Sequence, residues 1–383
     1  MLSIALELIS NFVLESEVRF VETNELASLF CLHSLERIGN RTLWKIKSSF
    51  GSFENCLDAS RHDLQASFLN EGIVGRILTV RQNTDRQQVL KEYLSSGARL
   101  SCIEDEDYPS WLGKTHDPPY LLYYRGDLGC LNELSIAIVG SRRASTYGKI
   151  QSRRFGRELA GKGITVISGM ARGIDTEAHI GALEAGGKTA AVLGSGLDVI
   201  YPPENKQLYN QISEQGVILT EFPPHTHPEP GNFPMRNRVI AGLSRGILVV
   251  EAQQRSGALI TVDFALEQGR DVFAIPGQIN SKNSEGTNNL IKQGACMVTE
   301  INDILSEYGL VQEQNKDSIQ QGELFDVSPE ERLVLDLLGT ESEHFDDLVY
   351  KSKLTIGELS TCLLQLELKG IIKALPGNYY VKT

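Results

Sequence analysis

Arginine recurs at three points in the middle of the chain, in the segments 140–143, 168–175 and 233–238, and the first two segments also contain glycine and serine. The first two segments follow short apolar runs, which is the pattern of a turn that ends a strand and begins a helix. Backbone amides at such turns bind anions, and arginine adds charge and paired donors. No acid, base or nucleophile stands at a recognisable catalytic spacing. The pattern therefore indicates a binder of phosphate backbones rather than an enzyme.

The first of these turns offers Ser141 and Arg142, which stand between an apolar run and a basic stretch. Side chain and amides together could hold one phosphate. The turn is not a P-loop, because no glycine-lysine-serine/threonine follows at the required distance. A second glycine pair, in 194–196, lacks the third glycine of a dinucleotide fingerprint, since Val199 occupies that place. We interpret that pair as a tight connection only.

The third segment contains Phe233, Arg236, Asn237 and Arg238. The arginines could add positive charge to the edge of the fold at which these turns meet. Phe233 could stack on a base, an interaction worth about 1–3 kcal/mol. Two plainer interpretations stay open: Phe233 is buried, or the arginines start a helix and pair with a nearby carboxylate. Ser256 opens a further helix after a strand and could aim amides at the same edge.

Six short apolar runs predict the strands that position these residues. Near-continuous apolar strands of this length suit a parallel sheet that is covered on both faces. The sequence therefore predicts an α/β fold, with an extended Rossmann-like, doubly wound, mostly parallel sheet over residues 81–306. The expected strands are 136–139, 165–168, 189–193, 217–220, 247–250 and 272–275.

The N-terminal segment, residues 1–80, has a helical pattern interrupted by glycine turns such as those at Gly39 and Gly51. Helix, glycine turn and helix is typical of SAM-like or helix-hairpin-helix modules of DNA proteins, in which turn amides contact phosphate. A small helical domain for packing or self-association is an equally good interpretation.

The C-terminal part begins with an acidic, polar linker at 307–326, which lacks the apolar content to fold alone. Ser328 and Pro329 then predict the start of a helix. Two further helices and a hairpin complete a winged-helix domain over 327–383. The second helix of its helix-turn-helix carries more acidic than basic residues. A protein contact or a regulatory role is therefore as good an expectation as the recognition of duplex DNA.

The net charge of −12 is concentrated in one segment. Residues 301–350 hold 13 Asp or Glu and 2 Lys or Arg, whereas residues 142–162 hold 7 Lys or Arg and a single Glu. Such a local basic patch can steer an anionic polymer. Neither a signal peptide nor a membrane-spanning run is apparent, so we expect a cytoplasmic protein. The six cysteines are scattered, which argues against a metal site or a disulfide framework.

Read in order, these motifs resemble the DprA/Smf family of DNA-processing proteins. The resemblance implies a protein that needs no cofactor, binds single-stranded DNA with little sequence preference, forms a homodimer through its Rossmann-like domain, and helps load the RecA recombinase during transformation. One departure is Met170, where the family more often has a small residue. The segments that carry the resemblance are 138–142, 168–175, 193–202, 233–242, 256–261, 272–277 and 286–295.

The resemblance also implies the site. Ser141 and Arg142 match the phosphate-binding turn of the family, and 233–238 matches its second binding segment. Gly169 and Ser256 are expected to line the same pocket, and Lys206 is a further expected phosphate contact. The predicted DNA-binding residues are Ser141, Arg142, Gly169, Lys206, Phe233, Arg236, Asn237, Arg238 and Ser256.

Two other functions remain open. A nucleotide-processing enzyme of the phosphoribohydrolase type would use Asp175 or Glu251 as a catalytic carboxylate. The P-G-G-x-G-T motif of such enzymes is missing, because Gln278 follows Ile-Pro-Gly277. Alternatively, the chain is an adaptor that acts mainly through the acidic linker and the winged helix.

Overall fold

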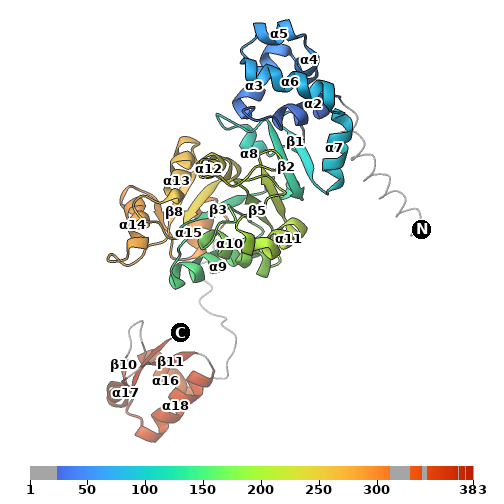
Figure 1. Ribbon diagram of the computed structural model, residues 1–383. Helices are drawn as coiled ribbons and strands as arrows, with labels where there is room; N and C mark the ends of the chain where they lie inside the picture. Colours follow the sequence, from blue (N-terminus) through green and yellow to red (C-terminus); the bar gives the residue numbers. More distant parts are fainter. Residues whose placement is uncertain (1–23, 311–327, 339–342, 370, 376, 383) are drawn as a thin grey trace, which may run out of the picture. The chain divides into compact units, whose positions relative to one another are not determined.

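The computed structural model describes residues 24–310, 328–338, 343–369, 371–375 and 377–382 (Figure 1). It divides into two compact units, Met1–Leu310 and Val311–Thr383.

The first unit is built around a nine-stranded sheet in the order β1-β2-β6-β5-β4-β3-β7-β8-β9. Neighbouring strands from β6 through β9 run parallel, whereas β1 and β2 pair antiparallel to each other and β2 pairs antiparallel to β6. All six sequence-predicted strands are present, and the α/β class is confirmed. The strands are β1 Arg99–Cys102, β2 Leu121–Gly126, β3 Ser135–Val139, β4 Thr165–Ser168, β5 Thr189–Val192, β6 Val217–Thr220, β7 Gly246–Val249, β8 Asp271–Ala274 and β9 Cys296–Met297.

The sheet is doubly wound, and the order in which the chain adds strands reverses at β3. From β3 the chain adds β4, β5 and β6 on one side, and it then returns to add β7, β8 and β9 on the other side. In open α/β sheets, ligands bind beyond the carboxyl ends of the strands at such a switch point. The fold therefore directs attention to the turns that follow β3 and β7.

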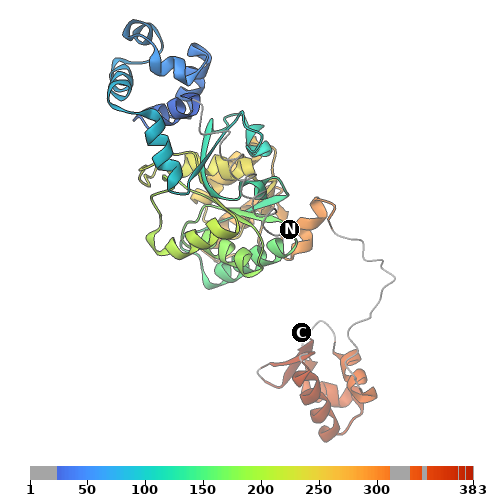
Figure 2. The ribbon, with the colours of Figure 1, turned by 90° about the vertical axis from the view of Figure 1, so that its right-hand side faces the viewer.

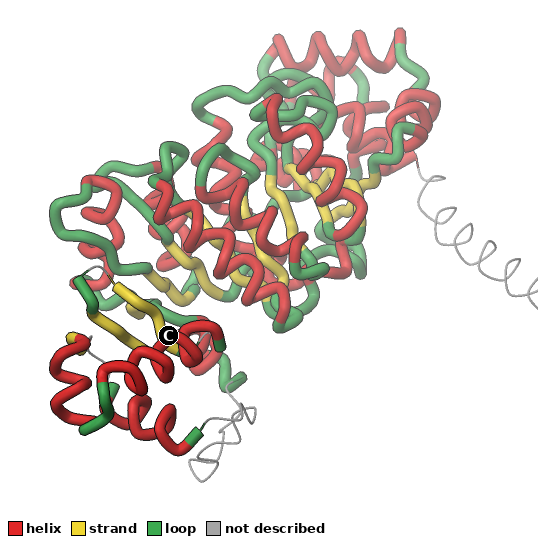
Figure 3. The backbone as a smooth tube through the Cα atoms, turned by 90° about the horizontal axis from the view of Figure 1, so that it is seen from below, coloured by secondary structure: helices red, strands yellow, loops and turns green. Residues whose placement is uncertain are grey.

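Helices cover both faces of the sheet, because successive strand residues alternate between two hydrophobic cores (Figure 3). Ile136 and Ile138 pack with residues of α9 Thr146–Gly161 and α10 Ile174–Glu184. Ala137 and Val139 pack on the other face. That face is covered by α12 Asn232–Leu243 and α13 Gly257–Glu267. The remaining elements of this part are α8 Ser110–Gly113, α11 Lys206–Gln215, α14 Glu285–Lys292, α15 Ile301–Glu307, and the short 3₁₀ helices η1 Leu128–Leu131, η2 Pro203–Asn205 and η3 Lys282–Ser284.

Within residues 24–98, six helices precede the sheet. They lie beside its β1–β2 edge (Figure 1 and Figure 2). They share a hydrophobic core with the sheet, and His33 Nδ1 lies 2.8 Å from the hydroxyl of Tyr123 on β2. The boundary predicted at residue 80 falls within α6, and one more helix follows it. The helices are α2 Asn24–His33, α3 Asn40–Phe50, α4 Phe53–Asp58, α5 Arg61–Ala66, α6 Glu71–Asn83 and α7 Arg86–Ser95.

The second unit is a winged helix, as predicted, with its own core around Val334, Leu348 and Leu363. Ser328 caps the first helix in a reciprocal capping box with Glu331. Most of the predicted linker at 307–326 lies outside the described residues. The elements are α16 Pro329–Leu337, α17 Phe345–Ser352, α18 Ile356–Leu368, and a sheet of β10 Glu343–His344, β12 Tyr379–Lys382 and β11 Ile372–Leu375.

All six cysteines are free thiols, and all are buried except the partly exposed Cys296. Burial raises the pKa of the Cys56 thiol to about 12, as expected for an inert residue in an apolar core. Over the described part of the chain, none of the helices combines the length and apolar character that a bilayer crossing requires.

Candidate nucleic-acid interface

A cavity of about 660 Å³, here called the first cavity, opens at the switch point of the sheet. Its walls come from the turns after β3, β4, β5 and β7 and from the first turns of α12 and α13. Six of the nine sequence-predicted site residues line it: Ser141, Arg142, Phe233, Arg236, Asn237 and Ser256.

The turn after β3 is held tightly against the end of β7. The amide of Ser141 donates to the carbonyl of Glu251 at 2.8 Å, and its hydroxyl accepts from the amide of Arg143 at 3.1 Å. A Cβ at Gly140 would lie 2.9 Å from the same Glu251 carbonyl oxygen, so only glycine fits this approach. The strand ends thereby fix the backbone from which Arg142 projects.

Phe233 lies in the first turn of α12, close to two guanidinium groups. The Cζ of Arg142 is 4.5 Å from its ring centroid, and the Cζ of Arg236 is 5.9 Å away. The ring of Tyr201 is also near, at 5.8 Å between centroids. Phe233 is partly exposed. It is therefore neither fully buried nor fully free to stack on a base. Arg142 is exposed, and among the described residues it forms no ion pair.

Arg236 is buried, with 3% of its surface exposed, and it serves as both a structural and a charged group. Its Nη1 donates to the carbonyls of Gly169 and Val192 at 2.6 and 2.5 Å, and its Nε donates to Asn237 Oδ1 at 3.1 Å. In the described part of the chain, Nη2 has no hydrogen-bond partner. Burial lowers the pKa of Arg236 to about 10, against the opposing effect of Asp175, so the guanidinium remains charged at neutral pH.

Asp175 and Glu251, the two carboxylates that an enzyme would need, lie in different surroundings. Asp175 lines the first cavity; burial raises its pKa, and the nearby Arg236 opposes the rise. Glu251 is not among the lining residues. Its oxygens accept from the amide of Ser145 at 2.9 Å and from the Ser145 hydroxyl, which caps α9. The Glu251 carboxylate is therefore committed to a helix start.

Three sequence-predicted residues are not brought into the first cavity. Arg238 points to the other side of α12, where it pairs with Glu221. Lys206 is exposed at the start of α11 and lines neither this cavity nor its small neighbour. Gly169 lines that neighbour, and its carbonyl holds Arg236.

Among the lining residues that sequence reasoning missed are Tyr201 and Gln253. Tyr201 belongs to a motif that the sequence analysis quoted, and it follows β5. The convergence of all carboxyl strand ends at one rim was a signal for it. Gln253 follows β7, so the same convergence applied to it.

The basic stretch of α9 is partly neutralised by carboxylates. Arg153 pairs with Glu184, and Arg154 lies 3.2 Å from Glu158. Arg143 is exposed and lines the first cavity. The positive charge at the rim therefore comes from the turn after β3 more than from the body of the helix.

Comparison with known proteins places the chain in a family. The family model described as DNA recombination-mediator protein A matches residues 99–309, and that of the DprA winged helix domain matches residues 321–378. Protein Smf of Synechocystis is 34% identical over 93% of this chain and 98% of its own length. DNA processing protein DprA of Streptococcus pneumoniae is 47% identical over 54% of this chain and 73% of its own.

Two solved structures share the fold. The crystal structure of DprA from Streptococcus pneumoniae superposes with a TM-score of 0.57 at 36% identity, over 71% of this chain and 99% of that one. A structure of DNA processing protein A from Helicobacter pylori, described for its single-stranded DNA binding mode, gives 0.50 at 32% identity, over 55% and 95%. The family models, the relatives and the fold agree, and this chain belongs to the DprA/Smf family of DNA processing proteins.

Proposed function

We propose that the first cavity binds the phosphate backbone of single-stranded DNA. The observation that carries the proposal is Arg142, an exposed guanidinium stacked on Phe233 at the switch point of the sheet, with no ion-pair partner among the described residues. The buried Arg236, with one terminal nitrogen left without a partner in the described chain, adds a fixed donor beside it. The relative from Helicobacter pylori, whose structure concerns single-stranded DNA, supports the choice of ligand.

Each group has a separate role in this proposal. Arg142 neutralises a phosphate, and a base that stacks on Phe233 takes the place of the guanidinium on that ring face. The N-terminus of α13, where the Ser256 hydroxyl accepts from Ala258 N at 3.3 Å, adds a favourable dipole. Contacts to phosphates and ring faces carry no base identity, so the expected sequence preference is small.

The proposed role in the cell follows from the family. We infer that the protein protects incoming single strands in the cytoplasm, helps load RecA on them, and forms a homodimer through its sheet domain. No catalytic step is part of this role. It does not require Asp175, and Glu251 is occupied by the start of α9.

The winged helix is not required for binding in the first cavity. Its α18 carries Glu358 and Glu367 and no lysine or arginine between Ile356 and Leu368. Helices that read DNA need positive or neutral contacts with phosphate. An adaptor role therefore suits this unit better than recognition of duplex DNA through α18.

Fluorescence anisotropy with a labelled oligothymidine, measured across a salt series, tests the proposal. Arg142→Ala is expected to weaken binding and to reduce the slope of log K against log salt by about 0.7, because one phosphate contact is lost. Lys162→Ala, which removes one exposed cation of the same basic stretch outside the cavity, is the matched control. Unchanged affinity and slope for Arg142→Ala would show that the cavity is not the binding site.

A further inference from the structure

A second cavity, of about 860 Å³, lies on the other side of the first turn of α12. Pro234 lines both cavities, and Met235 lines only the second. The side chain of Met235 is 46% exposed. The lining also includes Arg41, Trp111, Lys114, Gln268 and Arg270.

The lining of the second cavity carries more cations than anions. Arg41 and Lys114 are exposed, and within the described residues neither forms an ion pair. Of the two acids in the lining, Asp117 accepts from Asn40 at 2.9 Å, whereas Glu267 is exposed. The exposed positive charge of this cavity comes from Arg41 and Lys114, two side chains that can move to a ligand, and it exceeds the single negative charge of Glu267.

The second cavity also contains polar groups without partners. Gln268 Oε1 and Arg270 Nε are buried and have no hydrogen-bond partner in the part of the chain that is described. The first residues of the adjoining α3 line the cavity, and among the described residues no side chain caps this helix after Gly39. Anionic oxygen is the ligand that suits a helix N-terminus beside exposed cations.

Trp111 makes one wall of this cavity aromatic and basic at once. The guanidinium carbons of Arg245 and Arg270 lie 4.2 and 5.0 Å from its ring centroid, and Lys114 Nζ lies 5.3 Å away. Aromatic faces interleaved with cations are typical of grooves that hold single-stranded nucleic acid.

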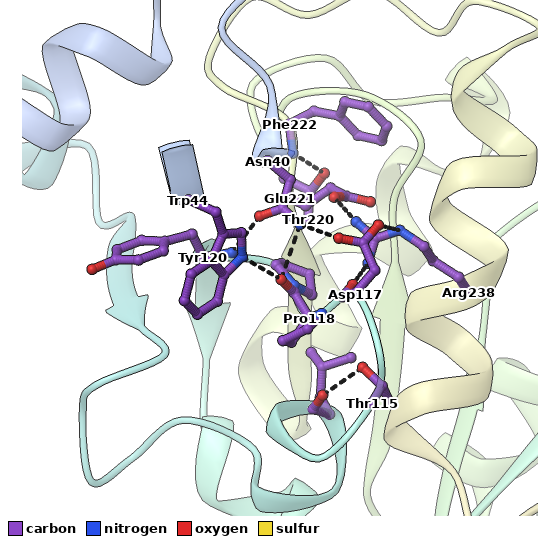
Figure 4. A network of polar contacts seen from close by, with 12 residues as sticks. Asn40, Trp44, Thr115, Asp117, Pro118, Tyr120, Thr220, Glu221, Phe222 and Arg238 are labelled. Carbon is purple, nitrogen blue, oxygen red and sulfur yellow. Dashed lines mark hydrogen bonds and ion pairs between the residues drawn. The ribbon is translucent and has the colours of Figure 1, made fainter. Parts of the chain in front are cut away.

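A polar network joins the start of α3 and α12 to the loop that precedes β2 (Figure 4). Asn40 at the start of α3 donates to the Pro118 carbonyl at 2.9 Å and accepts from the Tyr120 amide at 2.7 Å. Arg238 of α12 donates to the carbonyl of Asp117 and pairs with Glu221. Asn40 of α3 and Arg238 of α12 are thereby hydrogen-bonded to the same loop, residues 117–120.

We propose that the second cavity is a second subsite for the same DNA strand, an inference that rests on the proposed function of the first cavity. The strand leaves the first cavity over Pro234 and Met235 and places further phosphates against Arg41, Lys114 and the N-terminus of α3. The helical N-terminal region thus lengthens the stretch of strand that one protomer holds.

The length of the oligonucleotide separates the two subsites. In anisotropy titrations of the full chain, we would compare oligothymidines of about 5 and about 20 nucleotides, which bracket typical site sizes. The double variant R41A/K114A is expected to weaken binding of the long strand on the order of tenfold and to reduce its salt slope by about 1.4, because two phosphate contacts are lost. Its affinity for the short strand should equal that of the wild type.

Two controls make the outcome decisive. R61A/K91A removes two exposed cations of the same helical region that line neither cavity, and it should bind both strands normally. Arg142→Ala should weaken the binding of both oligothymidines. Long-strand binding by R41A/K114A at wild-type affinity and slope would overturn the second subsite and leave the first intact. Equal weakening of both strands by R41A/K114A would also overturn it. Wild-type binding by Arg142→Ala would instead overturn the proposed function itself.

Discussion

The two sides of α12 show how one residue type serves two purposes. Arg236 and Arg238 are two positions apart, which turns their side chains about 200° from each other on a helix. Arg236 bonds to backbone carbonyls and keeps a donor toward the first cavity, whereas Arg238 is closed off by the carboxylate of Glu221. The partner that folding supplies decides whether an arginine is available to a ligand.

The two sides also differ in their buried acids. Burial raises the pKa of Asp175 on the cavity side, and it raises the pKa of Glu221 to about 7 despite the opposing charge of Arg238. Glu221 Oε1 has no hydrogen-bond partner in the described chain. The Arg238 side of α12 therefore holds a buried ion pair whose desolvation costs free energy. The contribution of this pair to stability depends on both partners.

The largest effect is expected from Arg238→Ala, which removes the partner of a buried carboxylate. The free energy of unfolding should fall by about 3 kcal/mol. Binding of a short oligothymidine by the folded variant should not change, because Arg238 does not line the first cavity. Urea unfolding and anisotropy below the transition measure the two quantities. Loss of short-strand binding would place Arg238 in the first site after all.

The pH dependence of stability sharpens the same comparison. Glu221 has a folded-state pKa of about 7, above its ordinary value of 4.5, so the folded state binds its proton more tightly. The resulting stabilisation is present below the unfolded pKa and is lost as pH rises through about 7. Unfolding midpoints from about pH 5 to about pH 8 should fall in the wild type relative to Glu221→Gln. Parallel profiles for the two proteins would contradict the assignment.

A smaller effect, on both stability and binding, is expected from Gly169→Ala. The added Cβ overlaps the Arg236 guanidinium, which must move away from the Gly169 and Val192 carbonyls. Overpacking of this kind costs about 2 kcal/mol. Gly231→Ala, with nothing within 4 Å of its Cβ at the start of α12, is the matched control. Normal DNA affinity in Gly169→Ala would show that the position of Arg236 does not matter to the ligand.

The smallest effect is expected from Lys206→Ala. This exposed lysine begins α11 and lines neither the first cavity nor its small neighbour. Affinity for the short oligothymidine should therefore change by less than about twofold, as for a distant surface charge screened by salt. A loss as large as that of Arg142→Ala would extend the strand path toward α11.

The sequence predicted the strands and the turn at Ser141 and Arg142 well, because both are local. Apolar runs of four or five residues identify buried parallel strands, and a glycine turn after such a run identifies its carboxyl end. The roles of Arg236 and Arg238 were less accessible. Their separation depends on a helix that begins at Asn232, and their partners lie 17 or more residues away along the chain.

Periodic patterns and ordered motifs in the sequence were sufficient to identify the fold class, the winged helix and the family. The folded structure was needed to show which arginines reach the first cavity, that Glu251 binds the start of α9, and that α3 and α12 border a second cavity. These features could not be predicted because burial and pairing arise between segments that are distant in sequence. Arg142 stays available because folding places an aromatic ring beside it, whereas Arg238 is occupied because folding places a carboxylate there.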